Sequence, residues 1–270
     1  MATNESLKNQ IAKKRNGNQN TPQGYTIKQL MRAESVKQRF EETLGKKAPQ
    51  FMTSVINLVN SDTNLQKCDQ MSVVSSAMVA AALDLPIDKN LGYAWVVPYG
   101  NKATFQLGYK GYIQLALRTG QYRNINVIEV YEGELIKWDR LTEEIELDFE
   151  KRKSDKVIGY VGYFELINGF KKTVYWSKEQ IEEHRKKFSR TDFGWKNNYD
   201  AMAKKTVLRN MLSKWGILSV DMQKAYIEDT KNPEEVETEA ENIDIVDADF
   251  EEVEEAQKES QEEQQEFPIE

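Results

Sequence analysis

The strongest constraint on folding is a C-terminal segment that is too acidic to form a packed core. Residues 233–270 contain 17 aspartates and glutamates against one basic residue, Lys258. Such a segment is typical of a solvated, disordered tail, because its charges repel one another and it has little apolar surface to bury. The sequence therefore predicts a mobile basic arm over residues 1–24, a folded core over 25–230 and an acidic disordered tail over 231–270.

Charge is divided unevenly between this tail and the rest of the chain. The formal net charge is −7, but the 232 residues before the acidic segment contain 36 basic and 27 acidic residues. A basic body attracts polyanions, chiefly nucleic acid. Three roles remain open for the tail: it keeps the protein soluble, it shields the basic surface, or it recruits a basic partner.

Composition excludes several classes of protein. One cysteine, Cys68, and one histidine, His184, cannot form a disulfide framework or a four-ligand zinc site, and they leave no obvious Cys-His or Ser-His-Asp catalytic centre. The longest apolar stretch, from Val73 to Leu85, is shorter than the roughly 18 residues that span a membrane. The N-terminus has no apolar secretion signal, so the cytoplasm is the expected compartment and no membrane is expected as a partner.

Local patterns predict helices, then strands, a helix, strands and helices again. Helical periodicity runs from Thr26 to Leu44, from Ala48 to Val59, and onward from a Ser72 cap to Leu83. Further elements are expected as follows: strands from Tyr93 to Pro98 and from Ala103 to Leu107, a helix from Lys110 to Thr119, a strand from Asn124 to Tyr131, and a loop or extended hairpin from Lys137 to Lys156.

The clearest local signal is an Asn168-Gly169 turn between two β-prone runs, which predicts a hairpin. Ser177 and Gln180 then have the spacing of a capping box that opens a helix. The remaining expectations are a charged connection over 183–192, a long helix from Asn198 to Trp215 and a short helix from Val220 to Asp229. This order predicts an α+β fold with a curved antiparallel sheet or hairpins packed against helices, and no internal repeat is present.

The catalytic inventory is sparse. No Gly-x-x-x-x-Gly-Lys-Ser/Thr motif occurs, so a standard cradle for ATP phosphates is missing and no cofactor is expected. Glu146, Asp148 and Glu150 alternate and would share one face of a strand, which faintly suggests a Mg²⁺-dependent nuclease. A solvated edge strand explains the same pattern, so no catalytic residue and no metal ligand is assigned.

Basic residues and aromatic residues are interleaved in three segments. This combination suits a single strand of nucleic acid, because cations follow the phosphates and flat rings hold bases. The first segment, Lys102 to Arg123, has no acidic residue, and Gly108 and Gly111 on either side of Lys110 would let a DNA backbone approach the main chain. The second is the hairpin around Lys171 and Lys172, and the third runs from Lys186 to Lys196 and into the helix that ends near Lys214. The candidate DNA-binding residues are Lys102, Gln106, Tyr109, Lys110, Tyr112, Arg118, Arg123, Lys171, Lys172, Lys186, Lys187, Arg190, Lys196, Lys204, Lys205, Arg209 and Lys214.

Three aromatic residues are candidates for wedging between bases or stacking on them. Phe193 and Trp195 lie in a stretch that is rich in basic residues and contains Gly194, and Trp95 precedes an apolar run. Each of these residues, and each basic cluster, also fits a simpler interpretation as core aromatics or a solvated helix face.

Several blocks resemble the RecT family of phage and prophage recombinases. They are Leu83-Asp84-Leu85-Pro86, Leu91 to Tyr99, Thr104 to Ile113, and Ala201 to Arg209. In this chain the resemblance extends from about Tyr25 to Asp229.

The resemblance implies an ATP-independent single-strand DNA annealing protein that is not an enzyme and acts in homologous recombination in a bacterial host cell. Proteins of this family coat single-stranded DNA, pair it with a complement, and assemble as rings or helical filaments on the annealed duplex. A partner exonuclease, and possibly a single-strand binding protein, are implied with them. The alternatives are a Mg²⁺-dependent nuclease and a passive scaffold that binds single-stranded DNA.

Overall fold

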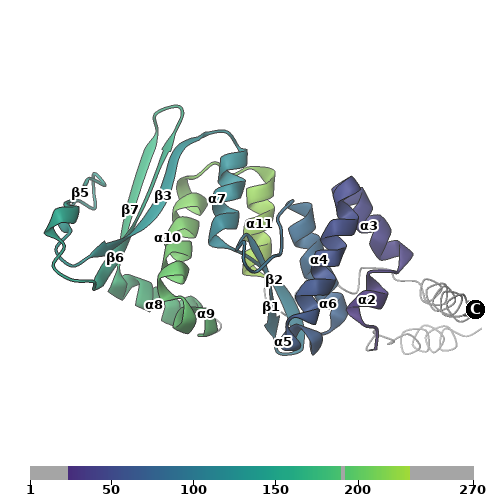
Figure 1. The fold of residues 1–270 in the computed structure, drawn as a ribbon. Coiled ribbons are helices and arrows are strands. Elements are labelled where there is room, and N and C mark those ends of the chain that lie inside the picture. Colours follow the sequence, from purple (N-terminus) through teal and green to yellow (C-terminus); the bar gives the residue numbers. More distant parts are fainter. Residues whose placement is uncertain (1–23, 190–191, 232–270) are drawn as a thin grey trace, which may run out of the picture. The chain divides into compact units, whose positions relative to one another are not determined.

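The computed structural model describes residues 24–189 and 192–231, which form two compact units (Figure 1). Unit 1 contains the described residues up to Asp84 together with Val96–Phe105 and Lys231, and unit 2 contains Leu85–Trp95 and Gln106–Thr230. Apart from Gly24 and Lys231, the predicted arm and tail lie outside the described residues. The mixture of helices and antiparallel strands confirms the predicted α+β class.

Unit 1 is a helical bundle around α6 (Gln70–Ala82), which contacts the other α-helices of the unit. Those helices are α2 (Ile27–Leu30), α3 (Glu34–Leu44), α4 (Ala48–Asn60) and α5 (Thr63–Gln66), with a 3-10 turn, η1 (Gly45–Lys47), between α3 and α4. Nine of the 13 residues of α6 are buried, so it shows almost no amphipathic stripe and takes the central position.

Two details of unit 1 differ from the sequence-based expectation. The predicted helix from Thr26 to Leu44 is divided, because α2 ends at Leu30 and α3 begins at Glu34. The cap of α6 is Asp69 rather than Ser72: the Asp69 carboxylate accepts from the backbone N–H groups of Met71 and Ser72 at 3.2 and 3.3 Å. The Ser72 hydroxyl instead accepts from the backbone N–H of Ala103 at 2.8 Å.

A two-stranded hairpin runs through both units. It consists of β1 (Ala94–Tyr99) and β2 (Lys102–Leu107), as the sequence predicts to within one residue. Within unit 1, Ser72 and Ser76 of α6 hydrogen-bond to the two backbone groups of Ala103. The polar face of an otherwise apolar helix therefore anchors the hairpin.

Unit 2 is built on an antiparallel sheet with the strand order β3-β6-β7. The strands are β3 (Tyr122–Tyr131), β6 (Val157–Leu166) and β7 (Lys171–Ser177), and Gly169 occupies the turn between β6 and β7 with φ +86°. A positive φ favours glycine, which confirms the hairpin predicted from Asn168-Gly169.

Helices pack against this sheet and against one another. The helix α10 (Tyr199–Trp215) contacts all three strands, α8 (Lys178–Phe188) contacts β6 and β7, and α7 (Tyr109–Arg118) contacts α10 and β3 (Figure 1). Short helices complete the unit: α9 (Phe193–Asn197) packs on α10, and α11 (Val220–Thr230) packs on α7. Gly162 on the central strand permits the close approach of α10, because an added Cβ would lie 3.0 Å from the Val207 side chain.

The charged segment before β6 forms a second hairpin, one of the two predicted outcomes. Its strands are β4 (Leu135–Trp138) and β5 (Ile145–Leu147), followed by the 3-10 turn η2 (Phe149–Lys151). The expected shared face of three acidic residues is wrong, because Asp148 leaves the strand and caps η2 by accepting from the Glu150 N–H at 3.1 Å. The connection expected over 183–192 is also wrong in part, since α8 continues to Phe188.

Candidate nucleic-acid interface

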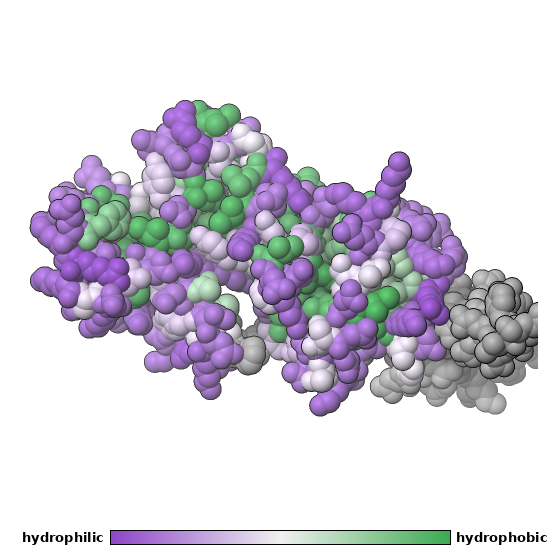
Figure 2. Space-filling model, in the orientation of Figure 1, coloured by the Kyte–Doolittle hydropathy of each residue, from purple (hydrophilic) through white to green (hydrophobic). Residues whose placement is uncertain are grey.

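The candidate DNA-binding residues differ widely in exposure. Hydrophilic side chains cover most of the face shown in Figure 2, interrupted by hydrophobic areas. The exposed candidates are Lys110, Arg118, Arg123, Lys171, Lys186, Lys187, Lys196 and Lys214; the half-buried ones are Lys102, Gln106, Tyr109, Lys204, Lys205 and Arg209; the buried ones are Tyr112 and Lys172. Arg190 lies outside the described residues. Lys102 belongs to unit 1, and the other described candidates belong to unit 2.

Several of these residues contact one buried carboxylate, that of Asp229 in α11. Its side chain is 2% exposed and lies 3.3 Å from the Lys205 Nζ and 3.9 Å from the Arg209 Nε. It also accepts hydrogen bonds from the Leu107 N–H at 2.9 Å and the Tyr112 hydroxyl at 2.7 Å. Two of the cations expected to bind phosphate therefore neutralise a buried charge inside unit 2.

Tyr112 is part of the core rather than of a surface. Its side chain is fully buried, and burial raises the pKa of its hydroxyl well above the ordinary value, with the Asp229 charge acting in the same direction. The phenol therefore stays protonated and donates to the carboxylate. Sequence reasoning missed Asp229, because nothing local links a residue in α11 to Leu107, 122 positions away.

Three further candidates have acidic partners. Lys204 lies 2.7 Å from Glu129 of β3, and Arg123 lies 2.8 Å from Glu165 of β6. Lys172, although basic, is 8% exposed, pairs with Glu143, and places its Nζ 3.5 Å from the ring centroid of Trp215. These contacts hold elements of unit 2 together, so the charges are partly neutralised before any polyanion binds.

The remaining lysines are available to a ligand. Six of them are exposed and have no ion pair within the part of the chain that the structure describes, and we call these the open lysines: Lys110, Lys171, Lys186, Lys187, Lys196 and Lys214. Lys186 and Lys187 lie in the last turn of α8, where the helix dipole also favours cations. The Ser177–Gln180 capping box at the other end of α8 is present as predicted.

The two described candidates for stacking on bases are not exposed. Trp195 of α9 is 5% exposed and packs 5.5 Å from the Tyr199 ring, so it belongs to the core of unit 2 and is not available to a base in this conformation. Trp95 is half-buried in β1. Phe193 begins α9, and its side chain lies outside the described part of the chain.

The glycines around Lys110 serve a different purpose from the one expected. A Cβ added to Gly108 would lie 2.1 Å from the Gly92 carbonyl oxygen, and one added to Gly111 would lie 2.2 Å from the Tyr93 carbonyl oxygen. The Gly108 N–H donates to that same Tyr93 oxygen at 2.8 Å. The backbone that approaches these glycines is thus the chain's own.

A row of three rings runs from β7 along α8. The Trp176 and His184 ring centroids lie 5.5 Å apart, and those of His184 and Phe188 lie 4.7 Å apart. Burial, followed by the positive charge of Arg209, lowers the pKa of His184. The imidazole is therefore neutral at neutral pH.

Acidification is expected to destabilise unit 2 through His184. Because its pKa in the folded protein lies below the ordinary value of about 6.5, its contribution to stability is present above that pH and is lost as the pH falls through the lowered value. His184→Gln has no charge to gain, so its melting temperature should fall less than that of the wild type between about pH 7 and pH 5. Thermal unfolding at both values checks this; parallel curves for the two proteins would contradict it.

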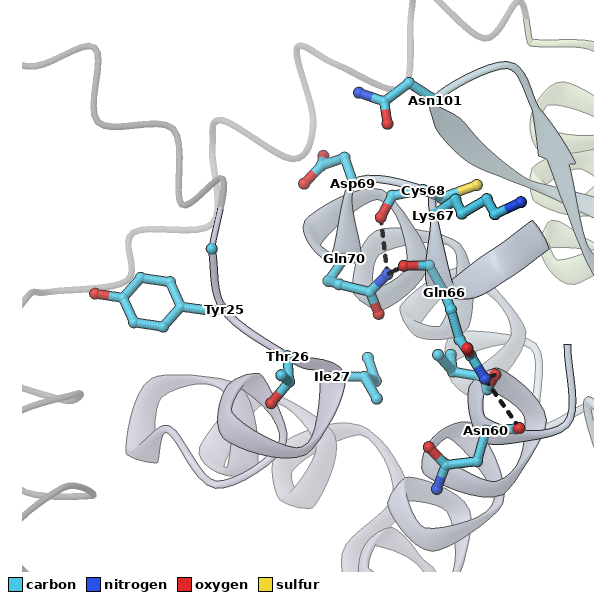
Figure 3. A pocket seen from close by; sticks show the side chains of 12 residues that line it. Tyr25, Thr26, Ile27, Asn60, Gln66, Lys67, Cys68, Asp69, Gln70 and Asn101 are labelled. Carbon is cyan, nitrogen blue, oxygen red and sulfur yellow. Dashed lines mark hydrogen bonds between the residues drawn. The ribbon is translucent and has the colours of Figure 1, made fainter. Parts of the chain in front are cut away.

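One cavity of about 500 Å³ lies in unit 1, between the start of α2 and the α5–α6 junction (Figure 3). The Gln70 amide donates to the Leu65 and Cys68 carbonyl oxygens there, so it caps the end of α5. Burial, with the charges of Asp62 and Asp69, raises the pKa of the Cys68 thiol, which keeps it protonated and a poor nucleophile. None of the candidate DNA-binding residues lines this cavity.

The sequence profile of the RecT family matches residues 49–244. The chain belongs to the RecT family. It is 62% identical over 269 residues to a protein of Bacillus subtilis (strain 168) named "Uncharacterized protein YqaK", a match that covers 99% of this chain and 95% of that protein. It is 28% identical over 209 residues to "Protein RecT" of Escherichia coli (strain K12), covering 72% of this chain and 77% of the relative.

The RecT-family match begins within α4 and continues past α11, so it starts later than the Tyr25 expected from the resemblance. Every candidate DNA-binding residue lies inside it. In residues 24–189 and 192–231 no three His, Cys, Asp or Glu side chains form a group that could hold a metal ion. No helix in the same residues has the length and apolar character to cross a membrane.

Proposed function

We propose that this RecT-family protein anneals complementary single strands of DNA without ATP, as a step of homologous recombination. The observation that carries the proposal is the set of open lysines on unit 2, which are exposed and not neutralised within the described part of the chain. Membership of the RecT family supports the same activity.

The physical basis is the division of the cations into two groups. Lys205 and Arg209 stabilise the fold through Asp229, whereas the open lysines are free to displace counterions from phosphates. Screening the phosphate charge lets two strands that repel each other come together. Contacts to the backbone leave the base edges available to test for complementarity.

The proposal extends to self-assembly and to partner proteins. We propose that copies of the chain assemble as a ring or filament, so that the binding surfaces of neighbours extend along one strand. Annealing by this route breaks no covalent bond, so the protein needs neither a catalytic residue nor a metal. A partner exonuclease would supply the single strand, and a single-strand binding protein would share it.

An annealing assay separates this proposal from its alternatives. Two complementary oligonucleotides, one with a fluorophore and one with a quencher, are mixed with the protein without ATP, with and without Mg²⁺. Faster duplex formation in the absence of ATP supports annealing. Degradation of the strands in Mg²⁺ would instead indicate a nuclease, and binding without faster pairing would indicate a passive scaffold.

Removal of three open lysines is expected to weaken binding in a salt-dependent way. The variant Lys186→Ala/Lys187→Ala/Lys196→Ala should reduce the slope of log affinity for single-stranded DNA against log salt concentration by about 2, since each phosphate contact contributes about 0.7. Fluorescence anisotropy at several salt concentrations measures the slope.

A matched variant controls for the loss of charge. Lys28→Ala/Lys46→Ala/Lys224→Ala also removes three exposed lysines, from α2, η1 and α11. It is expected to keep the wild-type slope. Equal slopes for all three proteins would reject the assignment of the α8–α9 lysines to phosphate binding.

A further inference from the structure

The ring row Trp176–His184–Phe188 leads from two half-buried rings to one that is exposed to solvent. Ile181 of the same helix is fully buried, His184 is half-buried, and Phe188 is 60% exposed. Positions 181, 184 and 188 follow the spacing of one helix face. The apolar face of α8 therefore emerges from the core at its C-terminal end, and Phe188 is the outermost ring.

Phe188 contributes little to the stability of the fold. With more than half of its side chain in solvent, it buries limited apolar surface, and its contact is with the His184 ring at an interplanar angle of 42°. A single exposed apolar side chain needs no explanation by itself. What distinguishes Phe188 is the chemistry around it.

One cation lies near this ring, and a second precedes it in the same helical turn. The Lys187 Nζ lies 5.2 Å from the centroid of Phe188, and both Lys186 and Lys187 are open lysines. Arg185, by contrast, points to Glu182 and Asp192 at 3.2 and 3.7 Å. A ring beside unpaired cations provides both parts of a site for a single strand: the lysines contact phosphates and the ring face receives a base.

Another exposed phenylalanine lacks this environment. Phe149 of η2 is 61% exposed, nearly the same as Phe188, but it is flanked in sequence by Asp148 and Glu150. The two residues thus match in type and exposure and differ in the charge of their neighbours. Phe149 serves as the natural control for Phe188.

We propose that Phe188, supported by His184 and Trp176, stacks on an unpaired nucleobase of single-stranded DNA while Lys186 and Lys187 contact the adjoining phosphates. The inference rests on the proposed function, because it names the base-binding part of that surface. It also replaces Trp195, which the fold buries, as the stacking residue of the α8–α9 region.

Affinity for two kinds of single strand tests the proposal. One oligonucleotide carries bases throughout, and the other has the same phosphodiester backbone with abasic sites. Phe188→Ala is expected to lose about 5- to 150-fold affinity for the normal strand, the range found for loss of one stacked base. It should bind the abasic strand as the wild type does, and its salt slope should be unchanged because no phosphate contact is removed.

Further variants separate stacking from folding. Phe188→Leu keeps an apolar side chain but has no ring face, so it should lose affinity like Phe188→Ala, while Phe188→Trp should keep it. Phe149→Ala should bind both strands like the wild type. Circular dichroism and the melting temperature establish that each variant is folded.

Each outcome has a definite meaning. Two outcomes would reject the stacking role while the proposed function stands, provided that the wild type binds the normal strand. In the first, Phe188→Leu binds the normal strand as tightly as the wild type does. In the second, Phe188→Leu loses as much affinity for the abasic strand as it loses for the normal strand. If the wild type fails to bind single-stranded DNA at all, the proposed function itself fails. A Phe188→Ala protein that binds normally but sediments as a smaller species would assign the ring to a contact between copies of the chain and overturn the proposal.

Discussion

Replacing Asp229 by alanine is expected to destabilise unit 2 by about 3–5 kcal/mol, the usual cost of removing one partner of a buried ion pair. The carboxylate is 2% exposed and is shared by Lys205, Arg209, the Tyr112 hydroxyl and the Leu107 N–H. Without it, the half-buried Lys205 and Arg209 lose their counter-charge, and the Tyr112 hydroxyl and the Leu107 N–H, which belong to fully buried residues, lose their acceptor. Urea unfolding followed by tryptophan fluorescence measures the change.

The control for Asp229 lies on the same helix. Asp221→Ala removes the same charge from the exposed first turn of α11 and should change the free energy of unfolding much less. Adding Lys205→Met to Asp229→Ala should restore part of the lost stability, because the second change removes a charge that the first left unpaired. If Asp229→Ala unfolds at the same urea concentration as Asp221→Ala, the buried cluster does not stabilise the fold as its geometry indicates.

Replacing Gly111 by alanine is expected to destabilise the protein by about 1–3 kcal/mol, as overpacking does. Two effects oppose each other here. Alanine in a helix interior gains about 1 kcal/mol over glycine. The added Cβ, however, would lie 2.2 Å from the Tyr93 carbonyl oxygen and 2.7 Å from the Leu107 side chain, and the oxygen belongs to a backbone that cannot rotate away.

The clash should prevail at Gly111 because moving Tyr93 also disturbs the hydrogen bond that its oxygen accepts from the Gly108 N–H. Gly24→Ala is the control for adding a Cβ without a clash, since a Cβ at that position has no atom within 4 Å; Gly24 lies before α2, so the gain in helix propensity applies to Gly111 alone. Thermal unfolding of both variants checks the prediction. A Gly111→Ala protein as stable as the control would mean that the segment before β1 shifts at little cost.

Elements with strong local signals could be predicted from the sequence. The β6–β7 hairpin follows from an Asn-Gly turn that needs a positive φ, and the start of α8 follows from a capping box whose two hydrogen bonds join residues three apart. The helix α4 and the long α10 follow from apolar spacing. In each case the interacting groups lie within one turn of the chain, so the information is local.

Errors arose where a distant partner competed with the local signal. Ser72 has the chemistry of a helix cap, but its hydroxyl binds Ala103, 31 positions away, and Asp69 takes the cap instead. Asp148 alternates with Glu146 and Glu150 as in a strand, yet it ends the strand by capping η2. Trp195 follows a glycine and lies among basic residues, as expected of a side chain that wedges between nucleobases, but α9 places it in the core.

The candidate site shows the same division most sharply along α10. The distribution of basic and acidic residues along the sequence was enough to indicate a basic core, an acidic C-terminal segment and an attraction to polyanions. The charge of a side chain at neutral pH depends chiefly on its residue type, so this information is present in the sequence. Three lysines of one helix nevertheless have different roles: Lys204 pairs with Glu129, Lys205 pairs with Asp229, and Lys214 is an open lysine. Which cation is neutralised depends on carboxylates brought near by β3 and α11, and such proximity arises only when distant segments pack together.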